Sequence, residues 1–132
     1  MPSALAIQLD LASGVPAYRQ VIDQILMAIS TGVLAPGGQL PTVRQLAVDL
    51  SINPNTVVRA YRELEIRGIL TTQQGIGTFV SRTQVPANDA LRQKRLNQMT
   101  GEFVARAGRE GFTLSELIER LEELSAEKRS ES

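Results

Sequence analysis

A cluster of residues suited to binding phosphates and bases, Asn53, Pro54, Asn55 and Thr56, stands before an amphipathic run that ends near Gly68. Asn53 can cap a helix with its side-chain oxygen, and Pro54 suits the first helical position because an N–H would be unpaired there. The tip of such a helix carries partial positive charge, so Asn and Thr side chains there can bond phosphate oxygens or base edges. Asn53 could serve as a cap, as a contact, or as both.

Two arginines could join this cluster. Arg44 lies in the preceding amphipathic segment, and Arg59 lies within the run itself. A guanidinium can read guanine or clamp a phosphate. The plainer alternatives are that Arg44 is only solvated and that Arg59 or Arg62 pairs with nearby acidic residues, Glu63 or Glu65.

A helix-turn-helix is predicted to position these residues. Thr42 is a suitable N-cap for a first helix, a turn follows at residues 51 and 52, and the second helix begins after Asn53. Apolar residues recur at helical spacing in both segments: Val43, Leu46, Ala47 and Leu50, then Val57, Tyr61 and Leu64. After a short leading segment, an earlier helix is predicted to end near Gly32, with Tyr18, Val21, Ile22, Ile25, Leu26 and Ile29 on one face.

Two short strands, around residues 69–72 and 78–81, are predicted after the second helix of the pair. Gly75 and Gly77 suit a tight hairpin between them. A turn role explains both glycines, yet glycine also allows the backbone to approach a nucleic-acid strand, and Thr78 could bond a phosphate. A helix-turn-helix followed by a hairpin is a winged helix-turn-helix.

The rest of the chain is predicted to be a linker at residues 83–88 and two helices. The first helix has Leu91, Leu96, Met99, Phe103 and Val104, and the second starts at a capping box of Thr113 and Glu116. One stripe of the second helix is Leu114, Leu117, Ile118, Leu121 and Leu124. It could fold back on the winged domain or pair with a second chain, and we favour pairing. We therefore expect a mainly α chain with a winged helix-turn-helix at residues 1–82 and a dimerisation tail at 83–132.

Composition excludes several kinds of site. The 132 residues include no cysteine and no histidine, which removes disulfides, thiolate nucleophiles and imidazole bases, and we expect neither enzymatic activity nor a metal or cofactor. No stretch suits a membrane span or an export signal, so we expect a cytoplasmic protein. The net charge is zero, but residues 37–82 carry five basic and three acidic side chains, a mild sign of a nucleic-acid partner.

Residues 40–80, LPTVRQLAVDLSINPNTVVRAYRELEIRGILTTQQGIGTFV, closely resemble the DNA-binding domain of GntR-family transcription regulators. The motif NPNTVVRAYRELE is most similar to the YtrA-type branch, whose members add only a short helical tail. Residues 15–41, VPAYRQVIDQILMAISTGVLAPGGQLP, extend the similarity.

This resemblance implies a homodimer that binds a roughly palindromic operator in double-stranded DNA and usually represses. The residues that match the family's DNA-contacting motifs are Arg44, Asn53, Pro54, Asn55, Thr56, Arg59, Gly75, Gly77 and Thr78. The wing departs from the family, which commonly has basic residues where this chain has Gln73, Gln74 and Ile76. We expect promoter occlusion as the mechanism.

Two alternatives stay open from the sequence. A winged helix with an uncharged wing could bind protein instead of DNA, and salt dependence would discriminate between the two. The regulatory signal could be a small hydrophobic effector between the tail helices, or expression level alone.

Overall fold

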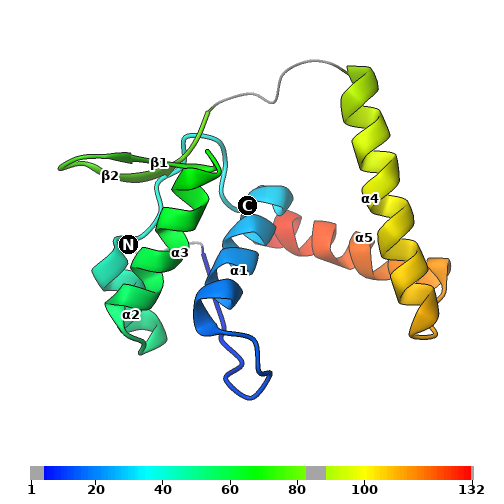
Figure 1. The fold of residues 1–132 in the computed structure, drawn as a ribbon, viewed down its shortest axis with the longest axis horizontal. Coiled ribbons are helices and arrows are strands. Elements are labelled where there is room, and N and C mark those ends of the chain that lie inside the picture. The colour runs from blue at the N-terminus through cyan, green and yellow to red at the C-terminus, as the bar shows by residue number, and fades with distance from the viewer. Residues whose placement is uncertain (1–4, 83–88, 132) are drawn as a thin grey trace. The chain divides into compact units, whose positions relative to one another are not determined.

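The computed structural model describes residues 5–82 and 89–131, which fall into two compact units (Figure 1). One unit is built from residues 5–82 and contains α1 (Ala17–Thr31), α2 (Val43–Leu50), α3 (Pro54–Ile66), β1 (Leu70–Gln73) and β2 (Gly77–Val80). The other contains α4 (Asp89–Arg109) and most of α5 (Leu114–Glu131). This is the predicted architecture: mainly helical, with a winged helix-turn-helix followed by two helices. The predicted linker at 83–88 lies outside the described residues.

The core of the first unit surrounds one face of α3, which contacts α1, α2 and β1. The buried residues of α3 are Val57, Ala60, Tyr61 and Leu64. Those that meet them from the other elements include Val21, Ile22, Ile25, Leu46, Ala47, Leu70 and Val80. The helical spacing read from the sequence identified most of this set, while Tyr18, Leu26 and Ile29 are only half-buried at its edge. Aliphatic burial of this kind, at roughly 25 cal/mol per Å², is the main stabilising contribution.

Tyr61 links α3 to the segment before α2. Its ring is buried, and its hydroxyl donates a hydrogen bond to the carbonyl oxygen of Pro41 at 2.7 Å. Burial raises the pKa of Tyr61 above its usual range, so the hydroxyl stays protonated and remains a donor. Tyr61 is therefore a core residue, as its place in the apolar stripe predicts.

The segment before α1, which the sequence indicated only as a short leading part of the winged domain, is packed into the core. Leu5 and Ile7 are buried in the core, and Leu9 packs against it. Two glutamines of α1 hold the backbone of this segment. The Gln8 N–H donates to Gln24 Oε1 at 2.8 Å, and Gln24 Nε2 donates back to the carbonyl oxygen of Gln8. In the same way, the Asp10 N–H donates to Gln20 Oε1 at 2.8 Å, and Gln20 Nε2 donates back to the carbonyl oxygen of Asp10.

The hairpin gains a third extended segment from residues 38–40, for which the sequence predicted no strand. β1 and β2 pair antiparallel, with Leu70 opposite Val80 and Gln73 opposite Gly77. On the other side of β2, Gln39 pairs with Phe79, the Leu40 N–H donates to Thr78 O at 2.8 Å, and the Val80 N–H donates to Gly38 O at 2.8 Å. The edge of β2 is thereby covered and the wing is stiffened.

In the second unit, the end of α4 and the start of α5 are both capped. Gly111, with φ +91°, closes α4, and the Phe112 N–H donates to Ala107 O at 3.0 Å. The predicted capping box is confirmed. The Thr113 N–H donates to Glu116 Oε1 at 3.0 Å, and the Glu116 N–H donates to Thr113 Oγ1 at 3.2 Å. The hydrogen bonds from the Thr113 backbone and hydroxyl lower the pKa of Glu116, because they favour its carboxylate form.

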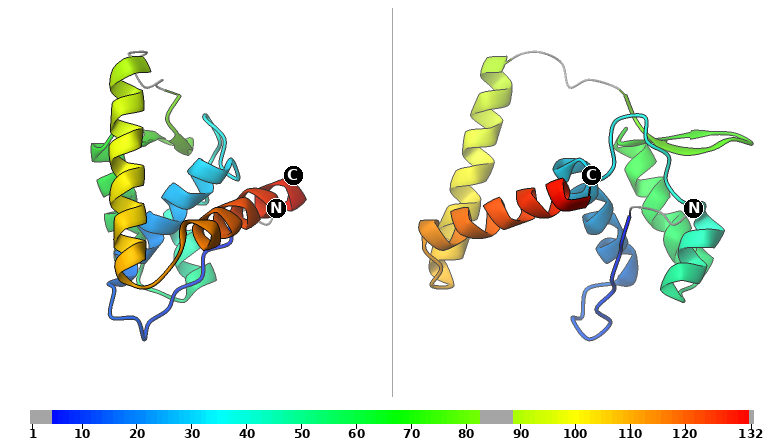
Figure 2. Two further views of the ribbon diagram at one scale, coloured as in Figure 1. Left: turned by 90° about the vertical axis from the view of Figure 1, so that its right-hand side faces the viewer. Right: turned by 180° about the vertical axis from the view of Figure 1, so that it is seen from behind.

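α4 and α5 leave much of their apolar surface uncovered. Figure 2 shows the two helices diverging from the turn that joins them, and Figure 1 shows the same arrangement. Eight large apolar side chains of this unit are between 45% and 63% exposed: Leu91, Leu96, Met99, Phe103, Phe112, Leu114, Ile118 and Leu121. Only Ala107 is buried among its described apolar residues.

The central place of α3 gives a stability prediction. Replacing the fully buried Leu64 with alanine leaves a cavity where α3 meets its neighbours, so Leu64→Ala should lower the free energy of unfolding by about 2–5 kcal/mol. Ile66, on the same helix but 78% exposed, provides the matched control. Ile66→Ala should change it by less than about 0.5 kcal/mol in the same urea titration. Equal losses would contradict the burial of Leu64 in the core.

Candidate nucleic-acid interface

The turn between α2 and α3 sets the direction in which α3 leaves the core. Ser51 adopts a left-handed conformation with φ 55°, uncommon for a residue other than glycine, asparagine or aspartate. The Ile52 N–H then donates to Ala47 O at 3.0 Å, which closes the end of α2. Thr42 caps the start of α2 as predicted, because its Oγ1 accepts from the Gln45 N–H at 3.0 Å.

The start of α3 has the predicted geometry. Asn53 is the N-cap, its Oδ1 accepts from the Asn55 N–H at 2.8 Å, and Pro54 occupies the first turn. Asn53, Pro54 and Asn55 are exposed, whereas Thr56, which the sequence grouped with them as a candidate contact, is half-buried. The cap uses the oxygen of Asn53, so its side-chain NH₂ group keeps two donors for another partner.

The two arginines singled out in the sequence are both exposed. Arg44 is the second residue of α2. Arg59 places its guanidinium carbon 3.7 Å from the centroid of the Tyr18 ring, on α1. The acidic residues considered as its alternative partners bond elsewhere. Glu63 pairs with Arg67 at 3.8 Å, and Glu65 accepts from the Thr72 hydroxyl at 2.7 Å.

A shallow hollow of about 320 Å³ brings several of these residues together where α1 and α3 begin. Its lining residues are Ala17, Tyr18, Asn53, Asn55, Thr56 and Arg59. The first turn of α1 has no side-chain cap and no acidic residue, and α3 has no acidic residue in its first turn. Two helix N-termini and one guanidinium therefore give the hollow a positive potential, suited to an anionic backbone.

The sequence did not identify Tyr18 as part of this surface. Its spacing relative to Val21 and Ile22 was read as part of the buried stripe, and it does pack at the edge of the core. One signal could have indicated this role. Tyr18 is aromatic and lies in the first turn of a helix that has no side-chain cap at its N-terminus.

The wing tip is a tight turn without charged side chains. The Ile76 N–H donates to Gln73 O at 2.9 Å, and Gly75 adopts φ +77°, which favours glycine. Gly77 has φ +150°, a conformation that side chains other than glycine rarely adopt, and a Cβ there would also displace the end of the Gln39 side chain, whose Nε2 lies 2.6 Å away. Thr78 is half-buried, with its hydroxyl 3.3 Å from that of Thr72. Gly75 and Ile76 are exposed at the tip, separate from the residues at the start of α3.

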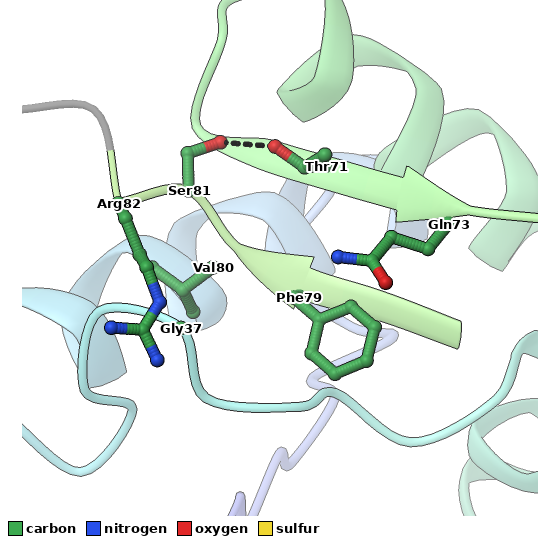
Figure 3. Close-up of a pocket in the computed structure, with 7 residues that line it drawn as sticks. All are labelled: Gly37, Thr71, Gln73, Phe79, Val80, Ser81 and Arg82. Carbon is green, nitrogen blue, oxygen red and sulfur yellow. Dashed lines mark hydrogen bonds between the residues drawn. The ribbon is translucent and has the colours of Figure 1, made fainter. Parts of the chain in front are cut away.

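A second hollow, of about 370 Å³, lies at the base of the wing (Figure 3). Thr71 and Ser81 share a hydrogen bond of 2.7 Å between their hydroxyls, and Arg82 lies so close to Gly37 that a Cβ on this glycine would meet Arg82 Nε at 2.5 Å. The remaining lining residues are Gln73, Phe79 and Val80. None of the residues that match the family's DNA-contacting motifs lines it.

The dimerisation residues predicted from the sequence lie along α5. Leu114, Ile118 and Leu121 are exposed, and Leu117 and Leu124 are half-buried. In the described part of the chain, no helix is long and apolar enough to cross a membrane. Residues 5–82 and 89–131 likewise bring together no group of three or more acidic side chains that could hold a metal ion.

A capped helix-turn-helix, a stiff wing and a positive hollow at the start of the second helix define a winged helix-turn-helix DNA-binding module. Residues 17–80 match the profile described as "Bacterial regulatory proteins, gntR family". The chain is 36% identical to the HTH-type transcriptional repressor YtrA of Bacillus subtilis over 121 residues. These residues cover 92% of this chain and 93% of that protein. The chain therefore belongs to the GntR family of DNA-binding transcription regulators, a family of regulators and not of enzymes.

Two solved structures extend the comparison. YtrA from Sulfolobus acidocaldarius, a GntR-family transcription factor, is 35% identical with a TM-score of 0.55, over 71% of this chain and 97% of that one. The DNA-binding domain of AraR in complex with operator ORX1 is 31% identical with a TM-score of 0.50, over 58% of this chain and 93% of that one.

The capping geometry separates two roles of Asn53 by experiment. Asn53→Ala removes the acceptor of the Asn55 N–H and should lower the free energy of unfolding by about 1 kcal/mol. Asn53→Asp keeps a capping oxygen and should preserve stability within a few tenths of a kcal/mol. Chemical denaturation of both variants without DNA makes the test, and an unchanged stability for Asn53→Ala would show that the cap contributes nothing.

Proposed function

We propose that the chain is a dimeric repressor that blocks a promoter by binding a palindromic operator. In this proposal residues 1–82 form the DNA-binding domain and residues 83–132 the dimerisation region. The observation that carries it is the joint exposure of Asn53, Asn55 and Arg59 around a hollow with two helix N-termini and no acidic lining residue. The printed name of Bacillus subtilis YtrA, a repressor, supports the direction of regulation.

On the DNA, α3 enters the major groove. Asn55 and Thr56 then face base edges, and Asn53 and Pro54 lie beside the phosphate backbone at the tip of the helix. Arg44, near the start of α2, reaches guanine or a phosphate from the same side. The wing lies along the flanking backbone, where the N–H groups at Gly75 and Gly77 and the hydroxyl of Thr78 donate to phosphates.

Dimerisation accounts for the exposed apolar side chains of α4 and α5. A lone chain would leave in water the eight large apolar residues of α4, α5 and the turn between them, and a second copy can cover them. Charge favours the same arrangement, because residues 83–112 carry five basic and three acidic side chains while residues 113–132 carry three basic and six acidic. The first helix of one copy is thus complementary to the second helix of the other. Two half-sites about one DNA turn apart would then be bound together.

The DNA-binding part of the proposal is tested by a salt series. Arg44→Ala should weaken binding to the operator by about 1–3 kcal/mol, roughly 5- to 150-fold, in fluorescence anisotropy with the promoter DNA of the chain's own gene. The slope of log K against log salt is negative, and its steepness measures the number of phosphate contacts. If Arg44 contacts a phosphate, Arg44→Ala should make this slope less steep by about 1, whereas loss of a guanine contact should leave the slope nearly unchanged.

Arg67→Ala is the matched control, because it removes the same charge at the opposite end of α3 from Asn53. It should bind within about twofold of the wild type. Binding that is independent of salt and no tighter than to random duplex would contradict a DNA role. It would favour a protein-binding module, whose exposed Ile76 at the wing tip would then be a contact residue.

The dimerisation part is tested by sedimentation. Ile118→Glu puts a charge into the apolar stripe of α5 and should convert the dimer to a monomer at micromolar concentration, with loss of tight operator binding. Glu119→Ala changes a neighbouring residue on the opposite face of the helix and should leave the dimer intact. A wild-type chain that sediments as a monomer at the same concentration would overturn this part of the proposal.

A further inference from the structure

The contact between Arg59 and Tyr18 joins two helices that start beside the same hollow. Tyr18 is the second residue of α1 and Arg59 lies in the second turn of α3, so the pair bridges 41 positions of sequence. The guanidinium carbon is 3.7 Å from the ring centroid, which is within the range for attraction between a cation and the face of an aromatic ring.

This contact leaves the hydrogen-bonding edge of Arg59 available. A guanidinium is planar and its five N–H donors point outward in that plane, whereas a ring that stacks on it occupies only one face. An arginine can therefore keep its aromatic partner while its N–H groups bond a phosphate or a guanine. A salt bridge would compete directly with DNA, and the nearby Glu63 is paired with Arg67 instead.

The direction in which Arg59 points also matters. Asn55 and Thr56 precede it by four and three residues, so all three share one face of α3 and line the same hollow as Tyr18. A long flexible arginine on an open helix surface would have to be ordered on binding, at a cost in conformational entropy. The ring of Tyr18 orders it before DNA arrives.

We propose that Tyr18 is a positioning residue of the DNA interface, whose ring holds the Arg59 guanidinium beside the start of α3 with its N–H edge free for DNA. This inference rests on the proposed function, because it requires Arg59 to contact DNA. It adds a residue from α1 that none of the sequence motifs indicated. The plain alternative is that Tyr18 only packs at the edge of the core.

A double-mutant cycle discriminates between these roles. The probe is the duplex that the full-length wild-type chain enriches from a random-sequence DNA pool, and the readout is its Kd by fluorescence anisotropy. Tyr18→Phe keeps the aromatic face and should bind within about twofold of the wild type. Tyr18→Leu should bind about two- to fivefold more weakly, the range expected for a cation–π contact at an exposed site. In an Arg59→Ala background, Tyr18→Leu should cause no further loss.

A second measurement keeps the test independent of folding defects. In the NMR spectrum of the free protein, the Arg59 Hε resonance should be shifted upfield by the ring current of residue 18. The shift should persist in Tyr18→Phe and disappear in Tyr18→Leu, while the remaining backbone resonances report that the fold is intact.

Several outcomes would overturn the inference. Equal losses for Tyr18→Leu in both backgrounds would make Tyr18 a structural residue only, and tighter binding by Tyr18→Leu would mean that the stack competes with DNA. Wild-type affinity for Arg59→Ala would remove the contact that Tyr18 serves. In each of these cases the wild type still binds DNA and Arg44→Ala still weakens it, so the proposed function stands. A wild-type chain that enriches no duplex removes the proposed function and this inference with it.

Discussion

The burial of one face of α3 is the constraint on which the rest of the first unit depends. Val57, Ala60 and Leu64 have no solvent exposure, so α3 cannot rotate about its axis without opening the core. Tyr61 adds a hydrogen bond to Pro41 that fixes α3 against the segment leading into α2. Because the inner face is held in this way, the outer face with Asn55 and Arg59 has a fixed direction. The precision of the candidate interface is thus a consequence of packing on the far side of the same helix.

Helical periodicity and capping chemistry were enough to predict the helices and the start of α3. Thr42, Asn53 and the pair of Thr113 and Glu116 act as caps because these are local interactions, determined by residues within three positions of one another. The family resemblance supplied the roles for Arg44 and the wing, which no spacing in a single sequence could provide.

The features missed by sequence reasoning all depend on contacts between distant segments. Residues 39 and 40 follow two glycines and gave no strand signal, yet Gln39 pairs with Phe79 of β2, 40 positions later. The contact of Tyr18 with Arg59 requires α1 and α3 to be packed together before it exists. Local pattern assigned Tyr18 to the core, and only the tertiary arrangement shows that it also lines the hollow.

The two units differ in how far their apolar side chains are buried. In the first, the apolar side chains of α1, α2 and the hairpin converge on α3, whereas α4 and α5 diverge from their turn and keep most of theirs in water (Figure 2). Two helices of this length cannot enclose a core by themselves. The first unit therefore buries a core of its own, and the apolar surface of the second is the surface that the proposed dimer would cover.

The segment before α1 extends the folding unit beyond the stretch by which the family is recognised. The family profile begins at residue 17, but Leu5 and Ile7 lie in the core and Gln20 and Gln24 each bond the backbone of that segment. A chimeric regulator made by transplanting residues 17–80 alone would expose the surface of α1 that these residues cover and leave both glutamines without their partners. A transferable module therefore has to include residue 5, twelve residues before the family profile begins.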